Sequence, residues 1–277
     1  MGKAKKTGLL LLAILIALFV LLPLVWMLST AFKNDFEALS GRMNFLPKKP
    51  TLDNFVQGLS GELMNTPILR WIVNSLSVGI VGTAIVLLID SMAAFALARL
   101  PDLPLRRTLL AMFIASLMIP GVLTFLPMYI EFNTLGLINT YQALILPATA
   151  GAFGVFLLYQ FFVSFPKEIE EAARIDGVNK WNLYRRILLP SAVSIMTTLG
   201  IFTFMGIYND FVWPLYATTS PEMRTITAGI AMMATGSYTQ SYGKLMAMTT
   251  IAALPVLILF IAGQKSFVRA ITSSGVK

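Results

Sequence analysis

The sequence contains no cysteine and no histidine. It therefore cannot form disulfides or use a thiol as a nucleophile, and it lacks the usual general base near neutral pH and the commonest metal ligand. The pattern GxxxxGK[ST], which cradles the phosphates of ATP, is also absent. We expect a chain that is not an enzyme, with no metal site and no cofactor of its own. If ATP drives this protein, another chain binds it.

Charged residues are also scarce. They make up 12% of the 277 residues, whereas 57% are hydrophobic. A soluble domain has about 25% charged residues, so the apolar excess indicates contact with lipid. The formal net charge of +8 could suggest nucleic acid. However, the charges fall between apolar runs, as they do when they flank membrane spans, and we expect no nucleic-acid partner.

Apolar runs of about 20 residues are long enough to cross a hydrocarbon core of about 30 Å. The first is longer than the apolar region of a cleaved signal peptide, so it is predicted to be retained. Proline and glycine at positions 120 and 121 break the third. The fold class is therefore all-α, a polytopic membrane protein with six transmembrane helices. The predicted spans lie near residues 9–27, 68–97, 109–130, 141–162, 191–213 and 245–267.

Polar segments divide the chain. We expect an N-terminal tail and first helix over 1–32, an extracytoplasmic connection over 33–67, a membrane core over 68–267 and a cytoplasmic tail over 268–277. An apolar run after residue 224 is too short to span, so a re-entrant or surface helix is predicted there. Of the 21 Lys and Arg residues, 14 fall on the N-terminal side of these spans and seven on the other. Positive charge stays in the cytoplasm, so both termini are predicted to be cytoplasmic.

The strongly polar segment 164–190 lies between the fourth and fifth spans. Pro166 suits the first turn of a helix, Gly177 can end it in the left-handed conformation, and Asn179 can cap a second helix. The pattern predicts a helix, a glycine corner and another helix on the cytoplasmic surface. Two apolar faces are expected, one in each helix: Ile169, Ala172 and Ala173, then Trp181, Tyr184, Ile187 and Leu188. The pattern alone is equally typical of a helical hairpin with only a structural role.

Glu171-Ala172-Ala173, Asp176-Gly177 and Leu189-Pro190 resemble the "EAA" loop of ATP-binding-cassette importer permeases. In that family the loop docks the cytoplasmic ATPase. The resemblance therefore implies that coupling to an ATPase rests on Glu171, Ala172, Ala173, Asp176 and Gly177. The sequence departs from many sugar permeases at Ser194, where they place a proline.

The sequence from Tyr208 to Pro214 resembles the "WNDFxWP" signature of carbohydrate permeases, with Tyr208 in place of the first tryptophan. Sugar hydroxyls need directional hydrogen-bonding partners, and their C–H faces stack on aromatic rings. The candidate pathway residues are Tyr129, at the outer end of the third span, with Asn209, Asp210 and Trp213. The alternative is an interfacial anchor, with Asn209 and Asp210 capping a helix end.

Together these resemblances imply the transmembrane domain of a type I importer, the permease of a carbohydrate transporter of the maltose type. Its implied partners are a second, related permease, two ATPase subunits that carry ATP and Mg²⁺, and an extracytoplasmic sugar-binding protein. The implied location is the inner membrane of a bacterial-type cell.

Other interpretations stay open. An importer of glycerol phosphate, a peptide or an amino acid is the first. An anionic substrate, however, would favour Lys or Arg deep in a span, and none lies there. An ion-coupled secondary carrier is the second, although Asp90 has no partner carboxylate in the membrane. Asp90 is expected either to face the bundle interior, bonded to a small residue such as Ser91, or to contact the partner permease as an ion pair or gate.

Overall fold

The computed structural model describes residues 3–40, 44–60, 66–100, 102–235 and 241–274. Every regular element in these ranges is a helix, which confirms the predicted all-α class. The chain divides into two compact units, Met1–Ile72 with Ile226–Pro255 and Val73–Thr225 with Val256–Lys277. We describe each unit separately.

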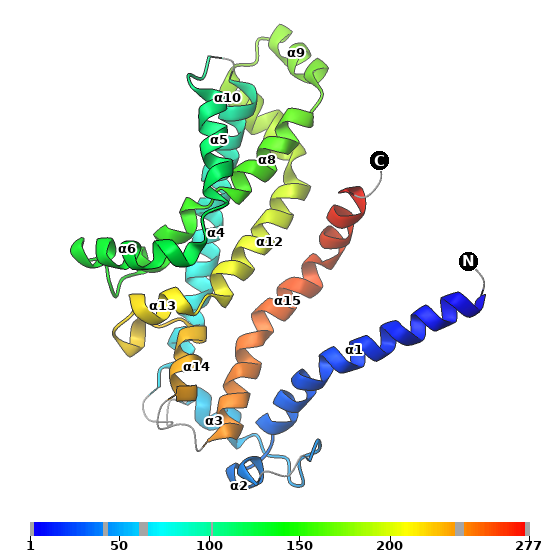
Figure 1. Ribbon diagram of the computed structural model, residues 1–277, viewed down its shortest axis with the longest axis vertical. Coiled ribbons are helices and arrows are strands. Elements are labelled where there is room, and N and C mark those ends of the chain that lie inside the picture. The colour runs from blue at the N-terminus through cyan, green and yellow to red at the C-terminus, as the bar shows by residue number, and fades with distance from the viewer. Residues whose placement is uncertain (1–2, 41–43, 61–65, 101, 236–240, 275–277) are drawn as a thin grey trace. The chain divides into compact units, whose positions relative to one another are not determined.

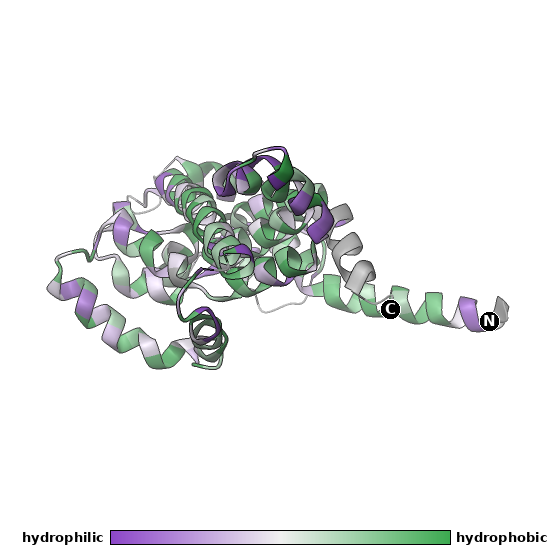
Figure 2. Ribbon diagram, turned by 90° about the horizontal axis from the view of Figure 1, so that it is seen from above, coloured by the Kyte–Doolittle hydropathy of each residue, from purple (hydrophilic) through white to green (hydrophobic). Residues whose placement is uncertain are grey.

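The first unit begins with a long apolar helix. Its elements are α1 (Lys3–Ala31), α2 (Asp35–Leu39), α3 (Asp53–Leu59), α14 (Ile226–Thr235) and the first parts of α4 (Ile68–Arg99) and α15 (Tyr242–Ser274). Figure 2 shows the turns of α1 as hydrophobic except next to the N-terminus, and its leucine and isoleucine side chains are exposed along its length. A helix that is apolar on all sides suits lipid, as predicted for the first span.

The polar connection after α1 is folded against the end of that helix. Lys33 is only 2% exposed, its ammonium donates to the carbonyl of Asn44 at 2.5 Å, and it lies 4.3 Å from the ring centroid of Trp26. Asn54 donates to the carbonyls of Ala31 and Lys33 at 2.8 and 2.6 Å. A buried cation needs such partners. Residues 33–40 and 44–60 of the connection are thus a structured part of this unit, and residues 41–43 and 61–65 of the predicted connection lie outside the described residues.

The short apolar helix predicted after residue 224 is α14. It packs within the first unit, where Ile226 and Met233 are buried. Gly229 lies directly against the indole of Trp71, and a side chain at this position would overlap the ring. Because Trp71 is itself 1% exposed, α14 is held by core packing.

The second unit contains most of the bent helices. Its further elements are α5 (Arg106–Ser116), α6 (Gly121–Thr134), α7 (Tyr141–Ile145), η1 (Leu146–Ala150), α8 (Phe153–Ser164), α9 (Lys167–Ile175), α10 (Lys180–Asn182), the π-helix η2 (Leu183–Leu188), α11 (Leu189–Ser191), α12 (Val193–Asn209), α13 (Val212–Ala217) and η3 (Pro221–Met223). Figure 1 shows the sharp corner between α5 and α6, which meet at 99° where Pro120 interrupts the helix.

The predicted spans correspond to three long helices and three bent pairs. Among the described residues, α1, α4 and α15 are long and apolar enough to cross a membrane. The pairs α5 with α6, α7–η1 with α8, and α10–α11 with α12 raise the number to six if each pair is one span. The last predicted segment, 268–277, is helical as far as Ser274 because α15 continues into it.

Two apolar clusters organise the second unit. The first lies where α4, α8, η2 and α12 meet, and it includes Phe95, Leu158, Phe162, Tyr184, Leu188 and Leu199. The second surrounds Trp213 and includes Val78, Ala143 and Leu144. The first cluster supports the predicted coupling segment, and the second supports the predicted pathway residues.

Candidate functional site

The segment predicted to meet an ATPase has the expected helix, corner and helix. Pro166 precedes the first residue of α9. Gly177 follows the helix with φ of 76°, and its N–H donates to the carbonyl of Arg174 at 3.0 Å. Asn179 caps the next helix by accepting from the N–H of Asn182 at 2.8 Å. These caps satisfy helix-end groups that would otherwise lack partners.

The buried face of α9 differs from the predicted one. Of Ile169, Ala172 and Ala173, only Ala173 is buried, while Ile169 is 46% exposed. The residue that turns inward instead is Glu170, at 6% exposure. The predicted buried face was based only on the spacing of apolar residues. Such spacing does not show that a buried cation can draw a glutamate side chain inward. That cation is Arg99, the last residue of α4.

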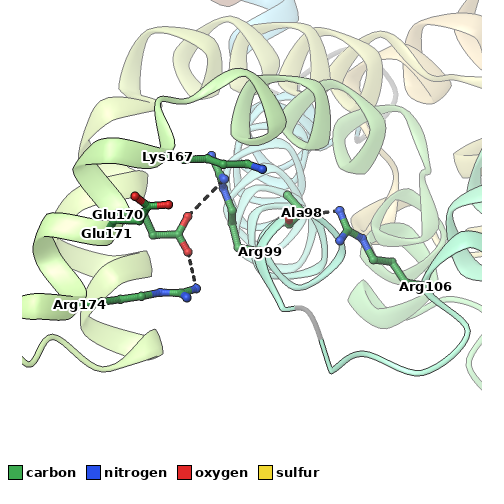
Figure 3. A pocket seen from close by; sticks show the side chains of 7 residues that line it. All are labelled: Ala98, Arg99, Arg106, Lys167, Glu170, Glu171 and Arg174. Carbon is green, nitrogen blue, oxygen red and sulfur yellow. Dashed lines mark hydrogen bonds and ion pairs between the residues drawn. The ribbon is translucent and has the colours of Figure 1, made fainter.

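Glu170 is held by two arginines (Figure 3). Its carboxylate lies 3.2 Å from the guanidinium of Arg99 and accepts from Arg174 at 2.7 Å. Arg99 also donates to the carbonyls of Phe162 and Phe165 at 2.5 and 2.7 Å. These charges line a cavity of about 240 Å³ between the end of α4 and α9, together with Ala98, Arg106, Lys167 and Glu171. Sequence reasoning did not assign Arg99 or Glu170 to the site. The signal in the sequence that could have pointed to Arg99 is its position as a charged residue at the end of an apolar span.

The second helix of this segment is firmly packed. Tyr184 and Leu188 are buried, and the Tyr184 hydroxyl lies 2.8 Å from that of Ser91. The chain here takes six residues of π-helix, a rare form often found at functional sites. Trp181 is 53% exposed. Of the predicted coupling residues, Ala173 is buried and four are exposed: Glu171, Ala172, Asp176 and Gly177.

The predicted pathway residues gather at a larger cavity of about 570 Å³. Asn209, Asp210 and Trp213 line it, with side chains that include Val78, Met128, Leu144, Thr203 and Thr225. Tyr129 is not among the lining residues. It packs instead against the apolar cluster that surrounds Trp213. The structure thus brings three of the four predicted residues to one cavity.

These three side chains are placed differently. Asn209 is exposed. Asp210 accepts from the N–H groups of Val212 and Trp213 at 3.1 and 3.4 Å, so it caps the start of α13. Trp213 is 6% exposed, and its indole N–H donates to the carbonyl of Ala143 at 2.7 Å. The capping role of the alternative interpretation therefore holds for Asp210, and Trp213 forms a rigid wall of the cavity.

Two asparagines that sequence reasoning missed fix the loop after α13. Asn139, with φ of 65°, accepts from the N–H groups of Thr219 and Ser220, both at 3.0 Å. Asn74 is fully buried and donates to the carbonyls of Glu222 and Arg224 at 2.7 and 2.9 Å. No local pattern marks them, because their partners lie 80 to 150 residues away.

The sequence of this chain is similar to those of a family of known proteins. Residues 90–273 match the family described as binding-protein-dependent transport system inner membrane component. The chain belongs to this family. One relative is a permease of a lactose transport system from Rhizobium radiobacter, 29% identical over 94% of this chain and 92% of the relative. Another belongs to a diacetylchitobiose uptake system of Streptomyces coelicolor, 32% identical over 92% and 83%.

A solved structure has the same fold as this transport component. A chain of a bacterial importer of the acidic polysaccharide alginate covers 96% of this chain with 98% of its own length, at 19% identity and a TM-score of 0.81. A trehalose/maltose permease from Thermococcus litoralis is 30% identical over 96% of this chain and 94% of its own. The family and the long apolar helices make the chain a multi-pass membrane protein.

Asp90 lies where this family match begins, within α4. It is 2% exposed, as expected for an inward carboxylate, and its Oδ2 has no hydrogen-bond partner among the described residues. Ser91 was expected to bond it. Instead, the Ser91 hydroxyl donates to the carbonyl of Leu88 at 3.1 Å and contacts the hydroxyl of Tyr184. Asp90 lies against Gly154 of α8, where a side chain would overlap the carboxylate.

Replacing Gly154 with alanine is therefore expected to destabilise this transport component. The added methyl group would meet both Asp90 and Leu199, and overpacking of this kind costs about 1–3 kcal/mol. The measurement is the thermal unfolding of the detergent-solubilised protein. Gly151→Ala is the matched control, since its nearest neighbouring atom is 4.0 Å away. Combining Gly154→Ala with Asp90→Ala should restore part of the loss, and equal effects of the two glycine variants would contradict this packing.

Proposed function

We propose that this chain is the permease subunit of an ATP-driven sugar importer. The observation that carries the proposal is its relationship to permeases of lactose, diacetylchitobiose and trehalose/maltose systems, each matched over more than nine-tenths of this chain. The cavity at Asn209 supplies a place of suitable chemistry, with amide, hydroxyl and carboxylate groups beside an indole. Sugars combine hydroxyl groups with apolar faces, so this mixture suits them.

The energy comes from partner chains in this proposal. The sequence lacks a phosphate-binding loop, so ATP and Mg²⁺ are bound by two partner ATPase subunits. A second, related permease completes the pathway, and an extracytoplasmic binding protein delivers the sugar. The ATPases dock on the segment 164–190, where Glu171, Asp176 and Gly177 are exposed. The charge distribution along the chain supports an orientation with this segment and both termini in the cytoplasm.

Transport then follows from alternating access. ATP closes the two ATPases on each other, and α9 passes that movement to the membrane helices. The pathway opens toward the binding protein, and hydrolysis resets it. The chain makes and breaks no covalent bonds. It has different contacts in two states, and ATP and the sugar bias the populations of those states.

The cavity favours an uncharged sugar. Among the described residues that line it, none is basic and the one charged side chain is Asp210. An anionic solute such as glycerol phosphate would be repelled by the half-buried carboxylate of Asp210 and would find no cation among these lining residues to pair with. We therefore expect neutral oligosaccharides to be carried in preference to uronates or sugar phosphates.

Reconstitution tests the function. The chain is purified with its ATPase, second permease and binding protein and placed in vesicles. Neutral and acidic oligosaccharides are then compared for ATP-dependent uptake and stimulated ATP hydrolysis. We expect uptake of a neutral sugar only with ATP and all four components. Uptake by this chain alone, driven by an ion gradient, would instead establish a secondary carrier, and uptake of only acidic sugars would refute the substrate class.

A further inference from the structure

The ion pair between Arg99 and Glu170 links three elements of the second unit. Arg99 ends α4, Glu170 lies in α9, and the carbonyls that Arg99 also binds belong to Phe162 of α8 and to Phe165 just after it. The paired side chains are only 6% and 8% exposed. A single guanidinium therefore joins the docking helix to two helices of the membrane core.

The arrangement gives both buried charges partners, although the Nε of Arg99 has none among the described residues. Arg99 offers a planar fork of donors, so it can serve one carboxylate and two carbonyls at once, which a lysine ammonium cannot do with the same geometry. The two carbonyls belong to the C-terminal end of α8, where the helix dipole favours a cation. Glu170 is balanced by Arg99 on one side and Arg174 on the other. Removing Glu170 would leave the buried guanidinium of Arg99 without a carboxylate, and removing Arg99 would leave Glu170 with Arg174 alone.

The side of α9 that faces away from Glu170 is open to a partner. Ile175 lies there at 86% exposure, whereas Glu171, which is also exposed, lines the same cavity as Glu170. A force that a partner applies to this exposed side can therefore reach the rest of the unit through Glu170 and Ala173, the buried residues of α9. Of these two, only Glu170 has a directional, charged contact with another element. Figure 3 shows it between α9 and the end of α4.

We infer that Arg99 and Glu170 are positioning residues that transmit movement of α9 to α4 and α8. The inference rests on the proposed function, since α9 must be the element that the ATPase moves. The pair is not itself a docking contact, because it is buried behind the exposed face of α9. Its loss should uncouple ATP hydrolysis from transport without removing the ATPase.

The test uses the whole complex, with uptake and sugar-stimulated ATP hydrolysis measured per assembled complex. Glu170→Gln keeps the size of the side chain and removes its charge, and Arg99→Lys keeps the charge and removes the fork. For each variant we expect the ATPase to co-purify while uptake and stimulation fall at least about tenfold, within the range of coupling between sites. If the wild-type complex itself fails to transport sugar, the proposed function fails. If it transports and the variants match it per complex, the positioning role fails.

A double variant tests whether Arg99 and Glu170 act as one unit, and stimulation per assembled complex separates coupling from a structural role. If Arg99 and Glu170 act as one unit, Arg99→Ala with Glu170→Ala should be no worse than the more damaging single change. If the loss in the double variant instead equals the product of the fold-losses of the two single variants, the inference is overturned. A fall in assembled complex with unchanged stimulation per complex would also overturn it, because that is the result of a merely structural contact.

Arg174 supplies the matched control. It contacts the same carboxylate at 2.7 Å, but its side chain is 54% exposed and it lies on the same helix, four residues on. Such a pair contributes little and joins no second element. Arg174→Ala should therefore lower stimulation less than Arg99→Lys does, because it breaks no contact with a second element. A loss equal to that of Arg99→Lys would overturn the inference, since it would place the effect within α9.

Discussion

Gly177→Pro is expected to abolish ATP-driven uptake. Gly177 has φ of 76°, whereas proline fixes φ near −65°, so the corner after α9 cannot keep its shape. The change also removes the N–H that donates to the carbonyl of Arg174. Asp176, with ψ of 4°, would precede the proline in a backbone region that proline disfavours. Uptake per amount of this chain should fall below about a tenth of the wild-type rate, because the ATPase should no longer co-purify, at a local cost of roughly 3 kcal/mol.

Gly136→Pro is a closely matched control. Gly136 has φ of 68°, its N–H donates to Asn133 at 3.0 Å, and it too follows a helix end, that of α6. The two variants should lower the thermal stability of the isolated chain by similar amounts. Only Gly177→Pro should lose the ATPase. Intact assembly and coupled transport in Gly177→Pro would remove this corner from the docking surface.

The features that could be predicted from sequence are those set by near neighbours. Gly177 and Asn179 were predicted to form the corner and the cap, because positive φ and side-chain capping depend on only a few residues. The apolar spans follow from length and hydropathy alone. The break at Pro120 could likewise be predicted, although its 99° angle could not, because that angle depends on what the two halves pack against.

The features that could not be predicted depend on residues far apart in the chain. Glu170 turns inward because Arg99, 71 positions earlier, lies beneath it, and helical periodicity contains no information about that contact. Trp213 was predicted as a pathway residue, yet its indole N–H is bound to Ala143, 70 positions earlier. In both cases the residue type indicated importance, while the direction of its side chain was set by tertiary packing.

Trp213→Ala is expected to lower the stability and the yield of the folded protein. Trp213 is packed edge-on against Phe125 and Phe132, with ring centroids 5.8 and 5.5 Å away. Removing a buried tryptophan costs about 3–5 kcal/mol and leaves a cavity. Trp213→Phe keeps an aromatic ring but leaves the buried carbonyl of Ala143 without the indole N–H, so it should cost less, about 1–3 kcal/mol. Protein yield and thermal unfolding of the solubilised chain measure both effects.

Asn209→Ala, at the same cavity, is expected to lower uptake without lowering the amount or the stability of the folded protein. Asn209 is exposed and contributes little packing, so the protein should accumulate and unfold as the wild type does. If its amide binds sugar hydroxyls, uptake should fall about tenfold, as for the loss of a good hydrogen bond. Asn133→Ala, an exposed amide outside the cavity, should leave uptake unchanged. If Trp213→Ala folds normally and loses only uptake, the indole contacts sugar rather than the core. If Asn209→Ala transports normally, the sugar path runs elsewhere.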